Sequence, residues 1–469
     1  MKPATARYGI LSLLLGALAV GAGCASSNSP GTTEEPVAVE AVADADVGAD
    51  LPSLEGEPTL DEYLTYAGRN NPGLRAAFNR WEAALDLVPQ AKSLPDPKLS
   101  YTNYVEEVET RVGPQRWNVS LAQTFPWFGK LSLRGRMALE AAHAARQHYE
   151  AARLRLLFEF KRAYYEYYYL GRAVAVTEEN VQLLGDLGDV ALAQYRAGAV
   201  PHSAVIRAQI ELAKGQDRLS TLRDMREPLV ADLNAALGRP PDAPLPWPKE
   251  LPAETADVTS EKLLEWLERN NPELKALDFA TAKENAAVAL ARKDRYPDIT
   301  LGVTYIETDE AIMAGTDDSG KDAVLAMLSI NLPLWAGKYR AAEREARARL
   351  DAALSERENR RNALAADVKM AWYSLHDAAR KITLYKETLI PQADQGLKVT
   401  QQAFKTGKAD FLDLIDAQQT LLELQLLYER VRVNRARRLA ELEMLVGRPI
   451  LQPEPAAEEE LKEDPRTFE

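Results

Sequence analysis

The chain contains an internal duplication, and this feature limits the possible folds more strongly than any other. The tetrapeptide Arg-Asn-Asn-Pro at 69–72 recurs at 269–272. The other matched segments, in chain order, are 125–130 (Phe-Pro-Trp-Phe-Gly-Lys) with 332–338 (Leu-Pro-Leu-Trp-Ala-Gly-Lys), Lys161, Ala163, Tyr164 and Tyr165 with Lys369, Ala371, Trp372 and Tyr373, Gly198 with Gly407, Gln209 with Gln418, and 237–240 with 446–449. The sequence therefore predicts two copies of one helix-strand-strand-helix unit, residues 58–238 and 259–449, joined by a proline-rich linker at 239–258.

Each copy is dominated by helical patterns of unusual length. The predicted helices are 60–93, 131–197 and 203–237 in the first copy, and 261–294, 339–406 and 411–446 in the second. These segments are rich in Ala, Leu, Glu and Arg, which are good helix formers. A continuous helix over 131–197 would be roughly 100 Å long at ~1.5 Å per residue. Helices of this length pack as coiled-coil-like antiparallel hairpins, so the fold class is mainly α.

Between the first two helices of each copy lie two segments with alternating apolar residues. They cover 99–105 and 117–125 in the first copy, and 299–305 and 324–332 in the second. Strands of about ten residues can cross a bilayer when tilted, and Tyr101, Trp117, Trp127 and Trp335 lie where an interfacial aromatic girdle would be. The alternative is a pair of soluble hairpins packed on a core. Four strands cannot close a membrane barrel, so membrane strands would imply oligomerisation.

The N-terminal segment is typical of an exported protein. A basic start with Lys2 and Arg7 precedes the apolar run 10–22, and Cys24, the only cysteine, follows directly. This pattern resembles a bacterial lipoprotein signal peptide at 1–23, with lipid such as palmitate attached to Cys24; an ordinary secretory signal is the alternative. Residues 24–57 read as an acidic flexible tether, and 450–469 as an acidic tail.

Composition excludes several function classes. A net charge of −13 argues against binding to nucleic acid. With 46% hydrophobic and 27% charged residues, the chain is neither globally disordered nor a polytopic helical membrane protein. The four histidines lack the spacing of metal ligands, and no catalytic constellation is present. We therefore expect no enzymatic activity and no cofactor.

The turn at Gly407 carries the most specific polar pattern. Gly407 can end one helix in the left-handed conformation, and Asp410 can cap the next. Asp413 and Asp416 are three residues apart and share one helix face. The local interpretation is a capping box formed by Asp410 and Asp413, which explains Asp413 but not Asp416.

The chain resembles the TolC family of outer-membrane efflux proteins. The resemblance rests on the duplicated layout, the Asn-Asn-Pro starts, the segments that follow the strands at 125–130 and 332–338, and the segment Asp-Leu-Ile-Asp-Ala-Gln-Gln-Thr at 413–420. The resemblance covers about residues 60–449. It implies a homotrimer with a 12-stranded β-barrel in the outer membrane of a Gram-negative bacterium and an α-helical barrel in the periplasm. It also implies contact with outer-membrane lipid, a periplasmic adaptor (membrane fusion) protein, and an inner-membrane pump of the RND or ABC type.

The resemblance also assigns roles to the two glycine turns. Gly198, Ala199, Gly407 and Lys408 would form the periplasmic tip that contacts the adaptor. Asp413 and Asp416 would line the narrow entrance as a gate, because a ring of carboxylates selects cations. At two positions where relatives carry an acid or an arginine, this chain has Ala204 and Ala409.

The family implies a passive duct that performs no chemistry, with metal ions or drugs as alternative cargoes. The competing hypothesis is a periplasmic coiled-coil lipoprotein with a structural or adaptor role. A spacer of that kind has no need for four strands of bilayer length with aromatic ends, so the sequence favours the channel.

Overall fold

The computed structural model describes residue 54 and residues 56–251 and 258–450. The predicted signal peptide, Cys24, nearly all of the predicted tether, part of the linker and the tail from 451 lie outside the described residues. Among the residues described, no helix is both long enough and apolar enough to pass through a bilayer.

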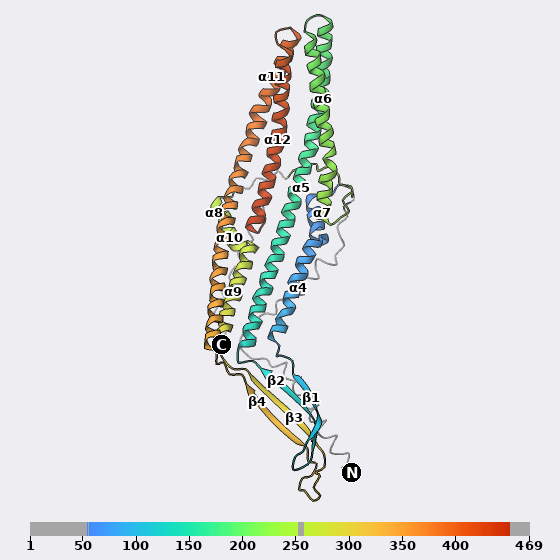
Figure 1. The fold of residues 1–469 in the computed structure, drawn as a ribbon. Helices are drawn as coiled ribbons and strands as arrows, with labels where there is room; N and C mark the ends of the chain where they lie inside the picture. The colour runs from blue at the N-terminus through green and yellow to red at the C-terminus, as the bar shows by residue number, and fades with distance from the viewer. Residues whose placement is uncertain (1–53, 55, 252–257, 451–469) are drawn as a thin grey trace, which may run out of the picture. The chain divides into compact units, whose positions relative to one another are not determined.

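The helices follow the same order in both halves (Figure 1). The first half contains α3 (Leu60–Asn70), α4 (Pro72–Lys92), α5 (Lys130–Arg196), α6 (His202–Asp224) and α7 (Arg226–Leu237). The second contains α8 (Ser260–Asn270), α9 (Pro272–Lys293), α10 (Ala336–Leu384), a π-helix (Tyr385–Leu389), α11 (Ile390–Lys405) and α12 (Phe411–Val446). The predictions for 131–197 and 411–446 are confirmed almost to the residue by α5 and α12.

The prediction of one continuous helix over 60–93, and another over 261–294, was wrong. Each is broken at an asparagine before a proline, where Asn71 and Asn271 have an extended backbone with ψ of 121°. A residue before proline is disfavoured in the helical region, and proline begins the next helix well because its nitrogen needs no partner there. Each asparagine then caps the new helix, accepting a hydrogen bond at 3.0 Å from the amide of Leu74 or Leu274.

Two other predicted helices are interrupted more mildly. The segment 203–237 divides at Met225, which keeps a helical φ of −65°. Pro228, three residues later, has no amide hydrogen for the carbonyl of Asp224, so the helical hydrogen-bond pattern is broken there. The segment 339–406 contains the π-helix Tyr385–Leu389 immediately before Pro391. Pro391 has no amide hydrogen for the carbonyl of Glu387, so the regular hydrogen-bond pattern cannot continue there.

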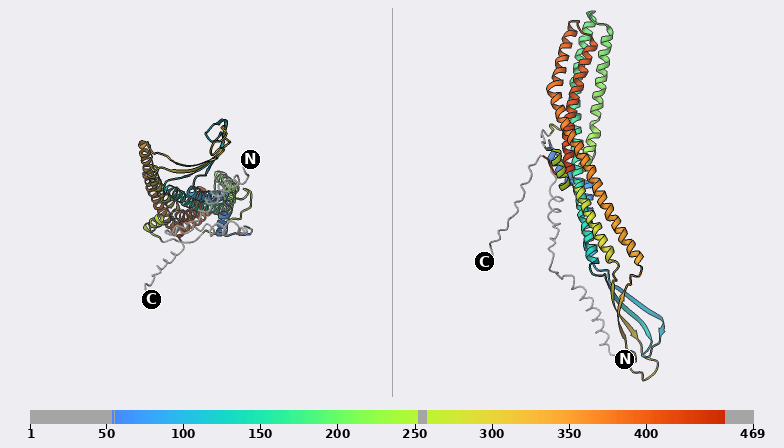
Figure 2. Two further views of the ribbon diagram at one scale, coloured as in Figure 1. Left: turned by 90° about the horizontal axis from the view of Figure 1, so that it is seen from below. Right: turned by 90° about the vertical axis from the view of Figure 1, so that its left-hand side faces the viewer.

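The four predicted strands are confirmed and form one antiparallel sheet in the order β1-β2-β3-β4. They are β1 (Lys98–Val108), β2 (Gln115–Phe125), β3 (Ile299–Thr308) and β4 (Ala323–Ile330). The central pair, β2 and β3, joins the two halves of the chain, and β1 and β4 are the edges of the described sheet. Figure 2 shows the sheet lying beyond the ends of α5 and α10 that are far from the glycine turns.

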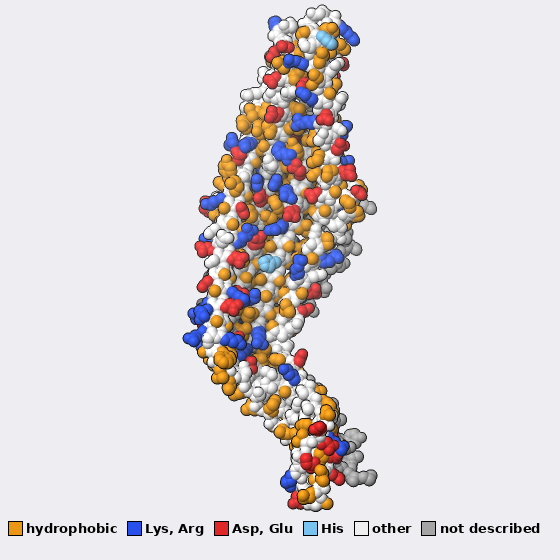
Figure 3. Space-filling view, in the orientation of Figure 1, with side chains coloured by type: hydrophobic (Ala, Val, Ile, Leu, Met, Phe, Trp, Pro, Cys, Tyr) orange, Lys and Arg blue, Asp and Glu red, His pale blue; other side chains and the backbone are white. Residues whose placement is uncertain are grey.

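The strand register gives the sheet one apolar face and one mainly polar face, on which β4 nevertheless places Leu325 and Met327. Leu121 lies opposite Leu99 and Val303, and Val303 lies opposite Ala326, so one face is apolar across all four strands. On the other face, Thr124 and Thr300 share a hydrogen bond of 2.9 Å between their hydroxyls. Many apolar side chains of the sheet are exposed, and apolar groups along it are visible in Figure 3. Such a surface fits lipid better than water.

The repeated Asn-Asn-Pro and Gly-Arg-Pro segments meet in space. The side-chain amide of Asn71 donates to the carbonyl of Ala236 at 2.9 Å, and that of Asn271 donates to Leu445 at 2.8 Å. The helix ends that they bind stop at Gly238 and Gly447, which have φ of +67° and +75°. Each half therefore uses its asparagine to satisfy the carbonyl groups of a helix terminus about 170 residues away.

We expect Gly447→Ala to destabilise the protein more than Gly407→Ala. Both glycines are left-handed, which costs an alanine about 1–2 kcal/mol. At Gly407 an added Cβ meets nothing within 4 Å, whereas at Gly447 it would lie 2.6 Å from the backbone oxygen of Asn270. Thermal unfolding in detergent, followed by circular dichroism, should therefore rank the melting temperatures as wild type, Gly407→Ala, Gly447→Ala. Equal losses for the two variants would contradict this account.

Candidate functional site

The two glycine turns are built in the same way. Gly198 ends α5 and Gly407 ends α11, each with φ of +71°, as predicted for Gly407. In both turns the amide after the glycine donates at 2.8 Å to the carbonyl five residues earlier, from Ala199 to Gln194 and from Lys408 to Ala403. This is the Schellman arrangement, which satisfies the last carbonyl groups of a helix.

The turns lie at the same end of the helices and share one apolar core (Figure 1). The buried members of this core come from all four helices: Leu184, Leu187 and Ala191 of α5, Ala204 and Ala208 of α6, Leu397 and Phe404 of α11, and Phe411, Leu414 and Ile415 of α12. The side-chain amide of Gln194 also donates to the carbonyl of Phe404 at 3.3 Å. We call this assembly of two turns and their core the tip.

The predicted capping box at the start of α12 is confirmed. The carboxylate of Asp410 accepts from the amide of Leu412 at 3.3 Å, and the carboxylate of Asp413 accepts from the amide of Asp410 at 3.0 Å. Asp416 is exposed, and it makes no hydrogen bond or ion pair with the described part of the chain. Asp413 thus has a local structural role, whereas helix capping does not account for Asp416.

Ala204 and Ala409, the two alanines noted near the turns, lie beneath them. Ala204 is 4% exposed in the tip core, and Ala409 packs against the same core. Neither position offers a charged group to the surface. The exposed carboxylates at the start of α12 are therefore Asp410, Asp413 and Asp416.

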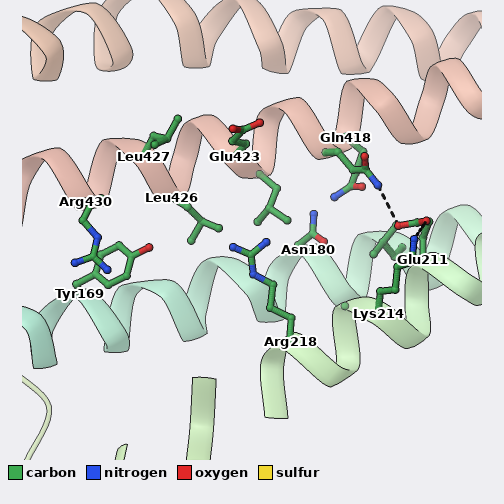
Figure 4. Close-up of a pocket in the computed structure, with 14 residues that line it drawn as sticks. Tyr169, Asn180, Glu211, Lys214, Arg218, Gln418, Glu423, Leu426, Leu427 and Arg430 are labelled. Carbon is green, nitrogen blue, oxygen red and sulfur yellow. Dashed lines mark hydrogen bonds and ion pairs between the residues drawn. The ribbon is translucent and has the colours of Figure 1, made fainter. Parts of the chain in front are cut away.

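Beside the tip, a groove of about 650 Å³ runs between α5, α6 and α12 (Figure 4). At one end Glu211 accepts from Lys214 at 2.8 Å and from Gln419 at 3.0 Å. At the other end the guanidinium of Arg430 lies 3.5 Å from the centre of the Tyr169 ring. The sequence analysis missed this groove, because its walls come from distant segments; Tyr169 and Arg430, for example, are about 260 residues apart.

Arg430 is firmly charged although it is half-buried. Burial by itself would lower the pKa of Arg430, but the hydrogen bond to Glu166 at 2.6 Å, the negative charge of Glu166 and the contact with Tyr169 together outweigh that effect, so the pKa is raised. Gln418, which also lines the groove, is 2% exposed, and its side-chain nitrogen has no partner in the described structure. Figure 4 shows Gln418 and Asn180 pointing toward one another from α12 and α5.

A second site was also missed, at the junction of the helices with the sheet. Lys130 is 3% exposed, and its ammonium donates to the carboxylate of Asp298 at 2.8 Å and to the carbonyl of Tyr296 at 2.9 Å. The same carboxylate oxygen accepts from the amide of Trp127 at 2.8 Å, and the Trp127 ring is stacked on Tyr296. We call these four residues the base joint.

Charge is stabilised within the base joint. Burial alone would raise the pKa of the Asp298 carboxyl, but the hydrogen bonds from Lys130 and from the Trp127 amide lower it below its ordinary value. Asp298 therefore carries a full negative charge at neutral pH. The base joint connects the end of β2 and the start of α5 with the segment between α9 and β3, so it joins the two halves.

No group of three His, Cys, Asp or Glu side chains in the described ranges is placed to hold a metal ion. The grooves are open and lined by mixed polar and apolar side chains. The geometry thus contains long helical hairpins, a sheet with one apolar face, and an acidic turn at the far end of the helices.

This fold is that of an outer-membrane channel protein. The outer-membrane channel OprN has a TM-score of 0.73 to this chain at 20% identity, covering 83% of this chain and 90% of that one. The outer-membrane protein VceC of Vibrio cholerae has a TM-score of 0.71 at 20% identity, with coverage of 83% and 96%. At these identities the likeness concerns the fold.

The family follows from the sequence match. The model of the outer membrane efflux protein family matches residues 65–239 and 263–448, and the chain belongs to this family. It is 24% identical over 427 residues to the cobalt-zinc-cadmium resistance protein CzcC of Cupriavidus metallidurans, covering 87% of this chain and 96% of that protein. The resemblance inferred from the repeated motifs is confirmed. The protein is an efflux channel of the outer membrane, in a family of transport proteins, and the periplasmic-spacer hypothesis loses its support.

Proposed function

We propose that three copies of this chain form a passive exit duct in a tripartite efflux system. The observation that carries this proposal is the four-stranded sheet, which has one apolar face and two unpaired edges in the described structure. An open edge in lipid leaves backbone groups without partners at several kcal/mol each, so the edges need other strands. Three sheets joined edge to edge would make a 12-stranded barrel, with the polar faces lining the lumen.

The helices would form the periplasmic part of the same duct. Their tip residues Gly198, Ala199, Gly407 and Lys408 are all exposed and would contact a periplasmic adaptor protein. The groove between α6 and α12 offers a second surface on which a helix of the adaptor could lie. An inner-membrane pump of the RND or ABC type would supply the free energy for transport.

Asp413 and Asp416 would form the gate. Both side chains are exposed on the first turns of α12, beside the tip core that fixes the helix. Threefold symmetry would bring six carboxylates together around the axis, and such rings select cations. The name of the relative CzcC points to cobalt, zinc and cadmium, so divalent metal ions are the cargo class that we favour over drugs.

Cys24 would carry the lipid that anchors the chain to the membrane, after removal of residues 1–23. Native mass spectrometry of protein extracted from the outer membrane tests the trimer and the anchor together. We expect a trimer with added lipid mass on each subunit. A trimer without lipid would overturn the anchor alone. A monomer recovered from the periplasm would overturn the shared barrel.

A further inference from the structure

The base joint has a counterpart in the repeat that is not assembled within one chain. Lys130 follows Gly129 as Lys338 follows Gly337, and Asp298 follows a proline as Asp96 does. Lys130 and Asp298 are bonded to each other, but Lys338 and Asp96 are both exposed. The chain therefore carries the parts of a second joint whose two halves do not meet.

The aromatic residues near the two lysines also differ, being packed beside Lys130 and exposed beside Lys338. Trp127 of the base joint stacks on Tyr296, with ring centres 5.5 Å apart and planes 9° from parallel. Its counterpart Trp335 is 75% exposed, and Leu94, which replaces Tyr296 in the first copy, is exposed as well. In the described part of the chain, the large aromatic side chain of Trp335 is therefore mostly uncovered.

The sheet gives the geometric reason. Lys130 follows β2 and Asp298 precedes β3, and these two strands are paired, with Phe125 opposite Ile299. Lys338 follows β4 and Asp96 precedes β1, and these are the two edges of the sheet. A second base joint can form only if β4 of one copy pairs with β1 of another.

We propose that Lys338 of each subunit binds the partner's Asp96, forming an intersubunit copy of the base joint. This inference rests on the proposed oligomeric barrel and specifies how its seams are made. Transferring the β2–β3 register to the seam places Leu332 opposite the partner's Pro97. Ile330 is then opposite the partner's Leu99, and Ser329 is opposite the partner's Ser100.

This register satisfies an independent requirement. Ile330 and Leu328 lie on the apolar face of the sheet, as do Leu99 and Tyr101. All four side chains are exposed in the single chain. The proposed seam continues the apolar face across the subunit boundary, whereas a slip of one residue would place apolar side chains against polar ones.

The helices, further from the sheet, also carry repeat counterparts that are buried in one copy and exposed in the other. Tyr165 of α5 is 3% exposed because it packs against α12, but its repeat counterpart Tyr373 of α10 is 62% exposed. Ile415 of α12 lies in the tip core, and its counterpart Ile206 of α6 is exposed. Residues buried where the two halves of one chain meet are thus uncovered where a second copy would have to meet them.

A carboxylate beside the base joint also has no counterpart in the first copy. Asp294, whose carboxylate lies 3.9 Å from the Lys130 ammonium, corresponds to Lys92 in the first copy. Asp96 is therefore the acid on which the second joint depends. Removing Asp96 should have a larger effect on the seam than removing any other single carboxylate near Lys338.

Disulfide trapping tests the register. Ser100→Cys with Ser329→Cys should give covalent dimers and trimers on oxidation in outer-membrane vesicles, because directly opposed strand residues have Cβ atoms within disulfide range. The single-cysteine variants control for Cys24, and Thr102→Cys with Ser329→Cys controls for register. Covalent dimers and trimers from the Thr102→Cys/Ser329→Cys variant but not from the Ser100→Cys/Ser329→Cys variant would overturn the proposed seam.

Charge exchange tests the joint itself. We expect Lys338→Asp and Asp96→Lys each to lower the dissociation temperature of the detergent-purified trimer by about 5 °C, and the double variant to recover most of that loss. Lys386→Asp, on an exposed lysine without an ion pair in the described structure, is the matched control. Single reversals that behave like Lys386→Asp would overturn the joint while the trimer stands. A wild-type protein that is monomeric by native mass spectrometry would instead overturn the proposed duct.

Discussion

Replacing Asp413 and Asp416 together by asparagine will raise the single-channel conductance several-fold and reduce the preference for cations over anions. In the proposed trimer the six carboxylates bind cations at the narrow entrance, and conduction requires that a bound ion also leaves. Removing the charges weakens that binding and opens the entrance to anions. Asparagine can still accept the hydrogen bond from the Asp410 amide, so the start of α12 should be preserved.

The measurement is made in planar bilayers, with conductance in symmetric salt and the reversal potential in a salt gradient. Asp367→Asn is the matched control, because Asp367 is an exposed acid on α10 far along the chain from the tip. Unchanged conductance and unchanged ion preference in the Asp413/Asp416 variant would show that the two carboxylates are not the gate. Asp413 would then have only its role in the capping box.

Asp298→Ala will destabilise the protein by about 3 kcal/mol, near the lower end of the range for breaking a buried ion pair. The variant leaves the ammonium of Lys130, whose side chain is 4% exposed, with the carbonyl of Tyr296 at 2.9 Å and the more distant carboxylate of Asp294 at 3.9 Å as its partners. Lys130→Met should cost less, because it removes the buried charge and keeps most of the apolar volume. Combining the two changes should therefore recover part of the loss caused by Asp298→Ala alone.

Urea unfolding in detergent, followed by tryptophan fluorescence, measures these three variants. The result that would contradict the argument is a Lys130→Met/Asp298→Ala protein no more stable than Asp298→Ala. Acid provides a second readout. The pKa of Asp298 is below its ordinary value of 3.8 in the folded protein, so its stabilisation is present above that value and is lost as the pH falls through the folded pKa. Asp298→Ala should remove this part of the acid sensitivity.

The order of the elements could be predicted from the sequence because it rests on local patterns. Alternation of apolar residues located the four strands, and long runs of helix formers located α5 and α12. The breaks at Asn71 and Asn271 also had a local signal, the proline that follows each. The sequence pattern could not indicate why both copies have asparagine at this position. The side-chain amide of each asparagine also binds a helix end on a distant part of the chain.

The candidate sites also differ in whether they are formed by residues close together in the sequence or by distant segments. The capping box at Asp410 and Asp413 is formed within four residues and could be predicted from spacing. The base joint brings together Lys130 and Asp298, which are 168 residues apart, and no periodicity links them. The groove beside the tip likewise depends on which helices become neighbours. In both cases the chemistry was visible in the sequence, but the proximity was not.

The pairing of β2 with β3 has a consequence for the biogenesis of the protein. These central strands belong to opposite halves of the chain, with Val119 opposite Tyr305. In a chain that is exported with its N-terminus first, β1 and β2 reach the periplasm long before β3 does. Until then the hairpin has an apolar face and an open edge, the features that favour aggregation, and contacts between distant residues form slowly. Periplasmic holding factors should therefore bind this first hairpin, and insertion into the bilayer must wait for the second half to be secreted.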